Sequence, residues 1–192
     1  HHSGLLKNSS IVIRKNPGYD YCIMARIIGV INQKGGVGKT TTANNLSAYL
    51  SALGKYVLLV DTDPQANATT GLGVYLKDDH LNLYHTLIGD YEPDAIIRKT
   101  GMLGFDVLPA ASNLAGASVE LVNVEEREFW LKNVFSKIST NYDYIVIDSG
   151  PSLGMLPINS LVASDGVIIP VQCEYYALEG LSQLLNTIDL VR

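Results

Sequence analysis

The feature that most constrains the fold is a glycine-rich segment, Lys34-Gly-Gly-Val-Gly-Lys-Thr-Thr-Thr42. The general phosphate-binding loop reads G-x-x-x-x-G-K-[ST]: its backbone N–H groups face the phosphates, the lysine reaches the β and γ phosphates, and the hydroxyl binds Mg²⁺. Residues Gly38–Thr40 match the end of this pattern. Gln33 occupies the position of the first glycine, and Lys34 adds a second cation. The segment therefore predicts a modified phosphate loop.

The residues on either side of this loop support the prediction. Residues 26–32 form a short, nearly all-apolar run, which is typical of a buried parallel strand. After the loop, apolar residues recur at three- and four-residue intervals up to Gly54, and this spacing predicts an amphipathic helix: Ala43, Leu46, Leu50 and Leu53. The N-terminus of that helix favours an anion. A turn that only joins strand to helix is the alternative, and the context favours phosphate binding.

Further apolar runs and helical patterns alternate along the chain. Strands are expected at 56–61, 105–108, 144–148 and 166–171, and helices at 81–88, 113–123, 125–139 and 177–191. This alternation predicts an α/β fold with a doubly wound, mostly parallel sheet and helices on both faces. In such sheets a ligand binds at the carboxyl ends of the strands.

Length and composition bound the domain organisation. A chain of 192 residues that is 47% apolar is large enough for one domain with a core, which we place at 24–192. Residues 1–23 begin with His1-His2 and are expected to be a tag remnant and leader outside the fold. The apolar runs are too short for a membrane span. A net charge of −5 argues against a generally basic nucleic-acid surface.

Three aspartates follow predicted strands at the edge where the loop lies. Asp61 and Asp63 end the second strand, and their spacing of two directs them to the same side of the sheet. Asp148 ends the fourth strand after Ile-Val-Ile, the context of an acid that holds Mg²⁺ through water. Taken alone, each aspartate is more typical of a strand-terminal residue that caps a turn. Beside a phosphate loop, the three together indicate a catalytic edge.

Two other chemistries have little support. Ser149 and Ser152 lack the G-x-S-x-G context and a suitably placed histidine, so a hydrolase triad is disfavoured. Cys22 and Cys173 lie far apart, with no metal-ligand spacing and no disulfide framework. Such cysteine usage fits a reducing cytoplasm.

At residues 32–42, 57–67 and 171–180 the sequence resembles the ParA/Soj family of chromosome and plasmid partition ATPases. These proteins are P-loop NTPases with a deviant Walker A motif and are related to MinD. The third string, Val-Gln-Cys-Glu-Tyr-Tyr-Ala-Leu-Glu-Gly, is similar to the Soj subgroup in particular. The resemblance implies ATP and Mg²⁺ as cofactors.

The resemblance also implies roles for individual residues. Two ATP molecules are expected between the chains of an ATP-dependent homodimer, with Lys34 reaching the phosphates bound by the other chain. Lys39 is expected on the β and γ phosphates, and Asp63 is expected to position the attacking water. The expected ATP-binding residues are Lys34, Gly35, Gly36, Val37, Gly38, Lys39, Thr40 and Thr41, with Thr41 at the α phosphate. The expected metal-site residues are Thr40, Asp61 and Asp148.

Function in the family implies further partners. The ATP-bound dimer is expected to bind DNA without sequence preference, to lie in the cytoplasm at the nucleoid, and to hydrolyse ATP slowly until a ParB-type protein stimulates it. The sequence departs from the family in two places. Asp-x-Pro-Pro is replaced by Asp148-Ser-Gly-Pro151, so that Gly150 is expected to loosen a turn near the γ phosphate, and family members continue beyond the equivalent of Arg192.

Three alternatives remain open from the sequence. The first is a nucleotide-binding regulator or scaffold that does not hydrolyse ATP, which Gly150 and the early end favour. The second is a MinD-like membrane switch, which needs an amphipathic anchor. The third is an iron–sulfur reductase related to nitrogenase iron protein, which needs more cysteine ligands than Cys173 supplies.

Overall fold

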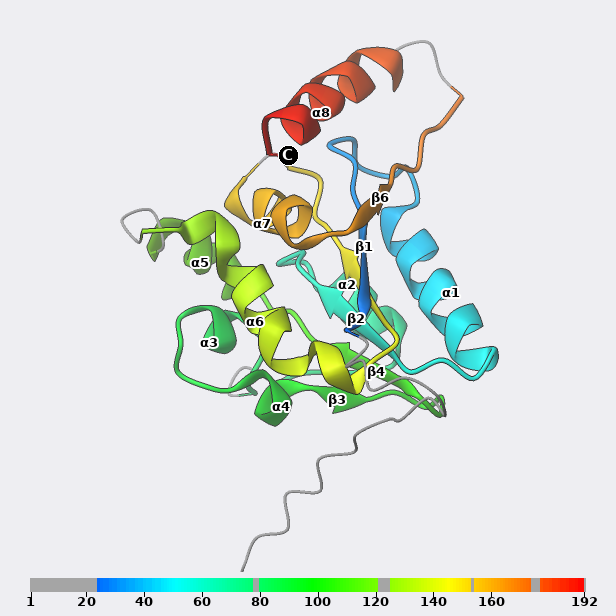
Figure 1. Cartoon of the computed structure of the whole chain (residues 1–192), viewed down its shortest axis with the longest axis vertical. Coiled ribbons are helices and arrows are strands. Elements are labelled where there is room, and N and C mark those ends of the chain that lie inside the picture. Colours follow the sequence, from blue (N-terminus) through cyan, green and yellow to red (C-terminus); the bar gives the residue numbers. More distant parts are fainter. Residues whose placement is uncertain (1–23, 78–79, 121–124, 153, 174–176, 192) are drawn as a thin grey trace, which may run out of the picture.

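The computed structural model describes residues 24–77, 80–120, 125–152, 154–173 and 177–191, so the expected leader lies outside the described residues. A six-stranded sheet in the order β3-β4-β2-β5-β1-β6 forms the centre of the molecule (Figure 1). All neighbouring strands are parallel except β3, which is antiparallel to β4. The strands are β1 Arg26–Val30, β2 Val57–Asp61, β3 Arg98–Lys99, β4 Phe105–Leu108, β5 Tyr144–Asp148 and β6 Gly166–Ile168. The predicted fold class is confirmed.

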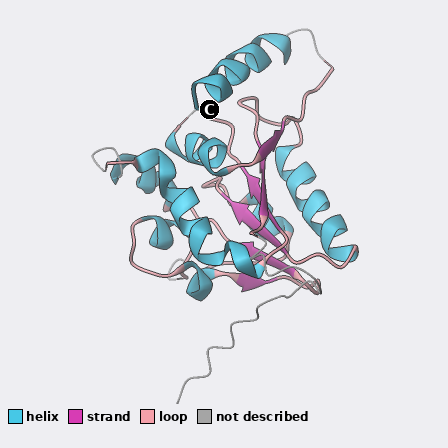
Figure 2. Cartoon of the chain, viewed as in Figure 1, coloured by secondary structure: helices cyan, strands magenta, loops and turns pink. Residues whose placement is uncertain are grey.

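Helices cover both faces of this sheet (Figure 2). One face carries α1, and the opposite face carries α5, α6 and α7, while α8 packs beyond α7 (Figure 1). The helices are α1 Lys39–Ala52, α2 Asn67–Gly71, α3 Leu83–Leu87, α4 Pro93–Ile96, α5 Leu114–Glu120, α6 Trp130–Ile138, α7 Met155–Ala163 and α8 Ala177–Val191. Two 3₁₀ turns, η2 Arg127–Phe129 and η3 Ser139–Asn141, flank α6.

Strand β2 shows why the sheet needs both helical layers. All five of its residues are buried. Successive side chains of a strand point to opposite faces. Leu58 and Val60 accordingly pack with residues of α5 and α6, whereas Val57 and Leu59 pack with residues of α1 and α2. A strand that is apolar on both faces is stable only inside a three-layer fold.

Among the described residues, two predicted elements differ from the structure by three residues or more at one end. The strand expected at 166–171 ends at Ile168. Pro170 follows, and it has no N–H group to donate to a neighbouring strand. The helix expected at 125–139 is a 3₁₀ turn followed by α6, because Glu126 has a positive φ of 55° that interrupts helical geometry.

Several short elements are absent from the sequence prediction. Helices α2 and α4 have five and four residues, and β3 has two, so none is long enough to show a clear period. Helix α7 is apolar on nearly every face and carries Pro157 in its first turn, where a missing N–H is tolerated. The helix expected at 113–123 is observed as α5, and residues 121–124 lie outside the described residues.

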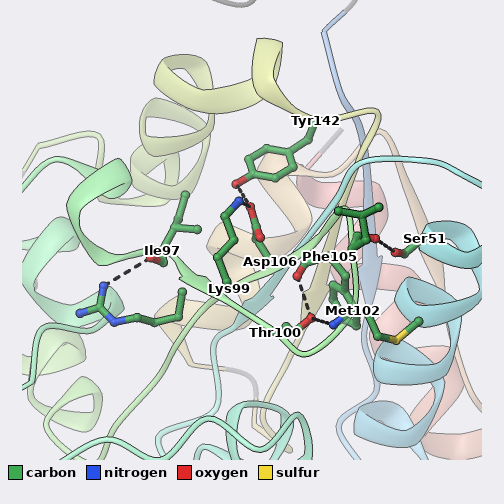
Figure 3. Close-up of polar contacts among 10 residues, drawn as sticks. Ser51, Ile97, Lys99, Thr100, Met102, Phe105, Asp106 and Tyr142 are labelled. Atoms are coloured by element: carbon green, nitrogen blue, oxygen red, sulfur yellow. Dashed lines mark hydrogen bonds and ion pairs between the residues drawn. The ribbon is translucent and has the colours of Figure 1, made fainter. Parts of the chain in front are cut away.

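A buried polar cluster stabilises the antiparallel pair of strands β3 and β4. It lies away from the predicted site, which is at the carboxyl ends of the parallel strands. Asp106 of β4 is buried and accepts hydrogen bonds from Lys99 Nζ at 2.8 Å and from the Tyr142 hydroxyl at 3.0 Å (Figure 3). Burial, together with the adjacent Asp106 carboxylate, raises the pKa of Tyr142. These side chains line a cavity of about 440 Å³. Because the Lys99 and Tyr142 side chains both donate to the Asp106 carboxylate, the cluster connects β3, β4 and the chain after η3 and has a structural role.

We expect Tyr142→Phe to lower the free energy of unfolding by about 1–2 kcal/mol, because it removes a charge-assisted hydrogen bond to a buried carboxylate. Urea denaturation followed by circular dichroism measures the change. Tyr84→Phe is the matched control, since the Tyr84 hydroxyl bonds Glu120 at an exposed position. Its stability should stay close to that of the wild type. Equal destabilisation of the two variants would contradict the role of the Asp106 cluster.

Candidate nucleotide-binding site

The loop between β1 and α1 adopts a backbone that only glycine accommodates readily. Gly36 and Gly38 have φ values of 73° and 91°, in the left-handed region. Gly38 is the residue before α1, so the first backbone N–H groups of that helix lie at the loop. Such N–H groups lack partners within the helix and attract anions. The backbone geometry therefore fits a phosphate group.

Lys39 is buried at the start of α1, with 6% of its surface exposed. Its Nζ atom donates a hydrogen bond to the backbone carbonyl of Lys34 at 2.9 Å, so the Lys39 side chain contacts the start of the loop. Burial lowers the pKa of Lys39, while the carboxylates of Asp148 and Asp63 oppose this shift. The ammonium group is thus held in a confined place between the loop and the aspartates.

A cavity of about 360 Å³ opens at this edge of the sheet. It brings together most of the predicted site residues: Gly35, Gly36, Gly38, Lys39, Thr40, Thr41 and Asp63. Asn67, Ser149 and Pro151 also line it and were not predicted as site residues. Lys34, Val37, Asp61 and Asp148 are predicted site residues outside its lining. Asn67 ends the 57–67 string, which is the one sequence signal that points to it.

Asp148 has the most unusual environment of the three aspartates. It is fully buried, and neither carboxylate oxygen has a hydrogen-bond partner among the described residues. Burial raises its pKa to about 7, and the nearby Asp61 and Asp63 carboxylates add to the rise. The Thr40 hydroxyl favours the ionised Asp148 carboxylate although the two form no hydrogen bond, and the positive charge of Lys39 favours it as well. A buried acceptor with no donor suits a cation and its water shell.

Asp61 is equally buried but its oxygens are occupied. Oδ1 accepts the N–H of Asp63 at 3.1 Å, and Oδ2 accepts the N–H and hydroxyl of Thr69 at 2.8 and 2.7 Å. Burial raises its pKa to about 6, although these hydrogen bonds oppose the shift. The contacts show that Asp61 holds α2 and the backbone of Asp63 in place. Its role at a metal stays a prediction.

Asp63 lies at the wall of the cavity. Its Oδ1 atom accepts the N–H of Gln65 at 2.9 Å, and 8% of the residue is exposed. Gly150 packs against it, since a Cβ atom on Gly150 would lie 3.3 Å from the Asp63 Cγ. The turn at Gly150 is closed by a hydrogen bond from the Ser152 N–H to the Gly150 carbonyl at 3.0 Å.

The donor set fits Mg²⁺ only together with phosphate oxygens. Within the described residues there is no group of three or more histidine, cysteine, aspartate or glutamate side chains that holds a metal ion by itself. Mg²⁺ ordinarily binds one or two protein groups, several waters and the phosphates of a nucleotide. The Thr40 hydroxyl and the unpaired Asp148 carboxylate are the groups suited to this arrangement.

Four features define a P-loop NTPase domain: a parallel strand with a neighbour on each side, a glycine loop with left-handed backbone, a lysine at the helix start, and an aspartate ending the adjacent strand. Residues 25–192 match the AAA_31 family, described as an AAA domain. The chain belongs to this family and, within it, to the ParA/Soj group of chromosome partitioning ATPases. The resemblance inferred from the sequence motifs is confirmed.

Two relatives show the similarity in sequence. The chain is 57% identical over 169 residues to sporulation initiation inhibitor protein Soj of Bacillus subtilis, covering 88% of this chain and 67% of Soj. It is 51% identical over 174 residues to chromosome partitioning protein ParA of Myxococcus xanthus, covering 90% of this chain and 61% of ParA. The chain thus spans somewhat less than two thirds of ParA.

A similar solved structure is cobyrinic acid a,c-diamide synthase from Mycobacterium smegmatis, with a bound ATP analogue and magnesium. The TM-score is 0.83 at 42% identity, covering 87% of this chain and 68% of that one.

Among the described residues, no helix combines the length and apolar character needed to cross a membrane.

Proposed function

We propose that the chain is the nucleotide-binding part of an ATP-hydrolysing dimerisation switch for chromosome or plasmid partitioning. The observation that carries this proposal is the unpaired, buried Asp148 carboxylate at the strand end beside the phosphate loop. The Mycobacterium structure with an ATP analogue and magnesium supports ATP and Mg²⁺ as cofactors. Because the chain spans only part of its relatives, the activity of the whole protein belongs to the proposal.

The proposed roles of the residues are those that the family resemblance implies. Lys39 neutralises charge on the β and γ phosphates, and Thr41 contacts the α phosphate. Thr40 and Asp148 hold Mg²⁺, directly or through water, and Asp63 orients the attacking water. Phosphoryl transfer needs little covalent help from protein, so positioning and charge neutralisation supply most of the rate. Asp61, through its bonds to Asp63 and Thr69, keeps the Asp63 turn in place.

We expect Lys34→Ala to bind nucleotide as a monomer, because in the proposed dimer this lysine reaches the phosphates bound by the other chain. Light scattering with and without ATP·Mg²⁺ measures the mass. Lys55→Ala, an exposed lysine beyond the end of α1, is the matched control and should dimerise as the wild type does. Dimerisation of the Lys34 variant at the wild-type ATP concentration would remove this account of Lys34.

A second candidate is a nucleotide-binding regulator or scaffold that does not hydrolyse ATP. Gly150 favours it, because a Cβ atom at this position would lie 3.3 Å from the Asp63 Cγ, and its absence leaves the Asp63 carboxylate less tightly confined. Steady-state ATP turnover by the whole protein separates the two candidates, with and without DNA and a ParB-type protein. Turnover that rises with both supports the switch, and no turnover in any mixture supports the scaffold.

The partners of the switch follow from the family. The ATP-bound dimer binds DNA without sequence preference, a ParB-type protein stimulates hydrolysis and releases it, and the protein acts in the cytoplasm at the nucleoid. The net charge of −5 means that any DNA-binding surface is local rather than spread over the chain. A steep decrease of DNA affinity with salt, seen with ATP and not with ADP, would test this surface.

A further inference from the structure

Hydrogen bonds connect the phosphate loop and the residue before it with the chain segment that follows β6. Asn32 Nδ2 donates a hydrogen bond to the carbonyl of Pro170 at 2.7 Å, and its Oδ1 atom accepts the N–H of Lys34 at 3.0 Å. A second bond runs from Gln172 Nε2 to the carbonyl of Gly36 at 3.1 Å. One side chain, Asn32, therefore connects the backbone of Lys34 with that of Pro170, which lies 138 positions after Asn32 in the sequence.

Asn32 is suited to this connection by its chemistry and its burial. An amide side chain has both a donor and an acceptor, and here each bonds a different backbone group. Only 9% of the residue is exposed, so water does not readily replace these bonds. Loss of the side chain would leave two backbone groups without their partner.

The carbonyl of Lys34 is held as well, by Lys39 Nζ at 2.9 Å. This bond would be lost if Lys39 Nζ turned away from the loop toward the phosphates of a nucleotide. The bond from the Lys34 N–H to Asn32 is unaffected by that exchange. Asn32 therefore holds Lys34 in the state in which Lys34 is expected to act.

We infer that Asn32 is a positioning residue: it fixes the backbone of Lys34 so that the Lys34 side chain meets the phosphates bound by a second chain. The inference rests on the proposed dimerisation switch. It predicts that Asn32 matters more for association with ATP than for binding ADP, because a single chain binds ADP without the second lysine.

Hydrogen exchange of the Lys34 amide, followed by NMR, tests the positioning directly. Loss of one buried hydrogen bond should speed exchange about tenfold in Asn32→Ala. Asn32→Asp keeps an acceptor for the Lys34 N–H and should retain the protection. Asn133→Ala, an exposed asparagine on α6, is the control. Wild-type protection of the Lys34 amide in Asn32→Ala would overturn the inference.

Titrations of ADP affinity and of ATP-dependent dimerisation on the whole protein complete the test. Asn32→Ala should bind ADP within about threefold of the wild type and should need about tenfold more protein to dimerise with ATP. Equal losses of ADP affinity and dimerisation would show a general structural role and would overturn the inference. A wild-type protein that remains monomeric with ATP contradicts the proposed switch instead, while amide exchange still decides whether Asn32 holds Lys34.

Discussion

Lys39→Ala should weaken ATP binding by about 100-fold or more, because the variant lacks at least two charge-assisted hydrogen bonds to phosphate oxygens. The structure gives the reason for so large an effect. The Lys39 ammonium is buried at the helix start beside Asp63 and Asp148, where no other lysine or arginine lines the cavity among the described residues. Isothermal titration with ATP·Mg²⁺ measures the loss.

A buried lysine also contributes to packing, so the fold needs its own check. Lys39→Met keeps most of the side-chain volume and should lose ATP affinity as Lys39→Ala does. Lys55→Ala should bind ATP normally. If the Met variant binds ATP within about threefold of the wild type while both variants fold, the phosphate-binding role of Lys39 is wrong.

Asp63→Ala should lower ATP turnover by about 100-fold or more and leave ATP affinity within about threefold, because a group that positions the attacking water acts mainly in the transition state. Single-turnover hydrolysis and equilibrium ATP binding measure the two effects separately. Asp90→Ala, an exposed aspartate after α3, is the control and should keep wild-type turnover.

Asp63→Asn separates the chemistry of this residue from its turn. The asparagine oxygen still accepts the Gln65 N–H that Asp63 Oδ1 accepts at 2.9 Å, so the local backbone is preserved. Turnover should nevertheless decrease as in the alanine variant. Wild-type turnover in Asp63→Asn would assign Asp63 a purely structural role.

Local sequence patterns were enough to predict the central fold. Strand β2 is apolar at four successive positions and needs burial on both faces, so its own residues require a layer on each side. Helix α7 escaped prediction because it is apolar on nearly every face and contains Pro157. Strand β3 has only two residues, and its place is fixed by pairing with β4 rather than by its own pattern.

At the candidate site, too, local sequence patterns predicted the position of residues but not their environment. Asp61 and Asp148 have similar sequence contexts at the ends of neighbouring strands, and both are fully buried. Asp61 is satisfied by Asp63 and Thr69, whereas Asp148 has no hydrogen-bond partner among the described residues. That difference arises from the packing of α2 against β2. Local patterns placed both at the edge of the sheet and did not distinguish their environments.

Contacts between distant segments were also beyond the sequence prediction. Ser149 and Pro151 line the cavity because β5 lies directly beside β1 in the sheet. The bond between Asn32 and Pro170 depends on β6 pairing with the other side of β1. Sheet order, which emerges only on folding, decides which residues meet the phosphate loop.

ATP-controlled association of two chains is tested most directly by the mass of the Asp63→Ala protein in solution. Light scattering should give twice the monomer mass with ATP·Mg²⁺ and the monomer mass with ADP·Mg²⁺, because the variant binds ATP and does not consume it. The same mass with both nucleotides, under conditions in which ATP binding is verified, would contradict the proposed switch.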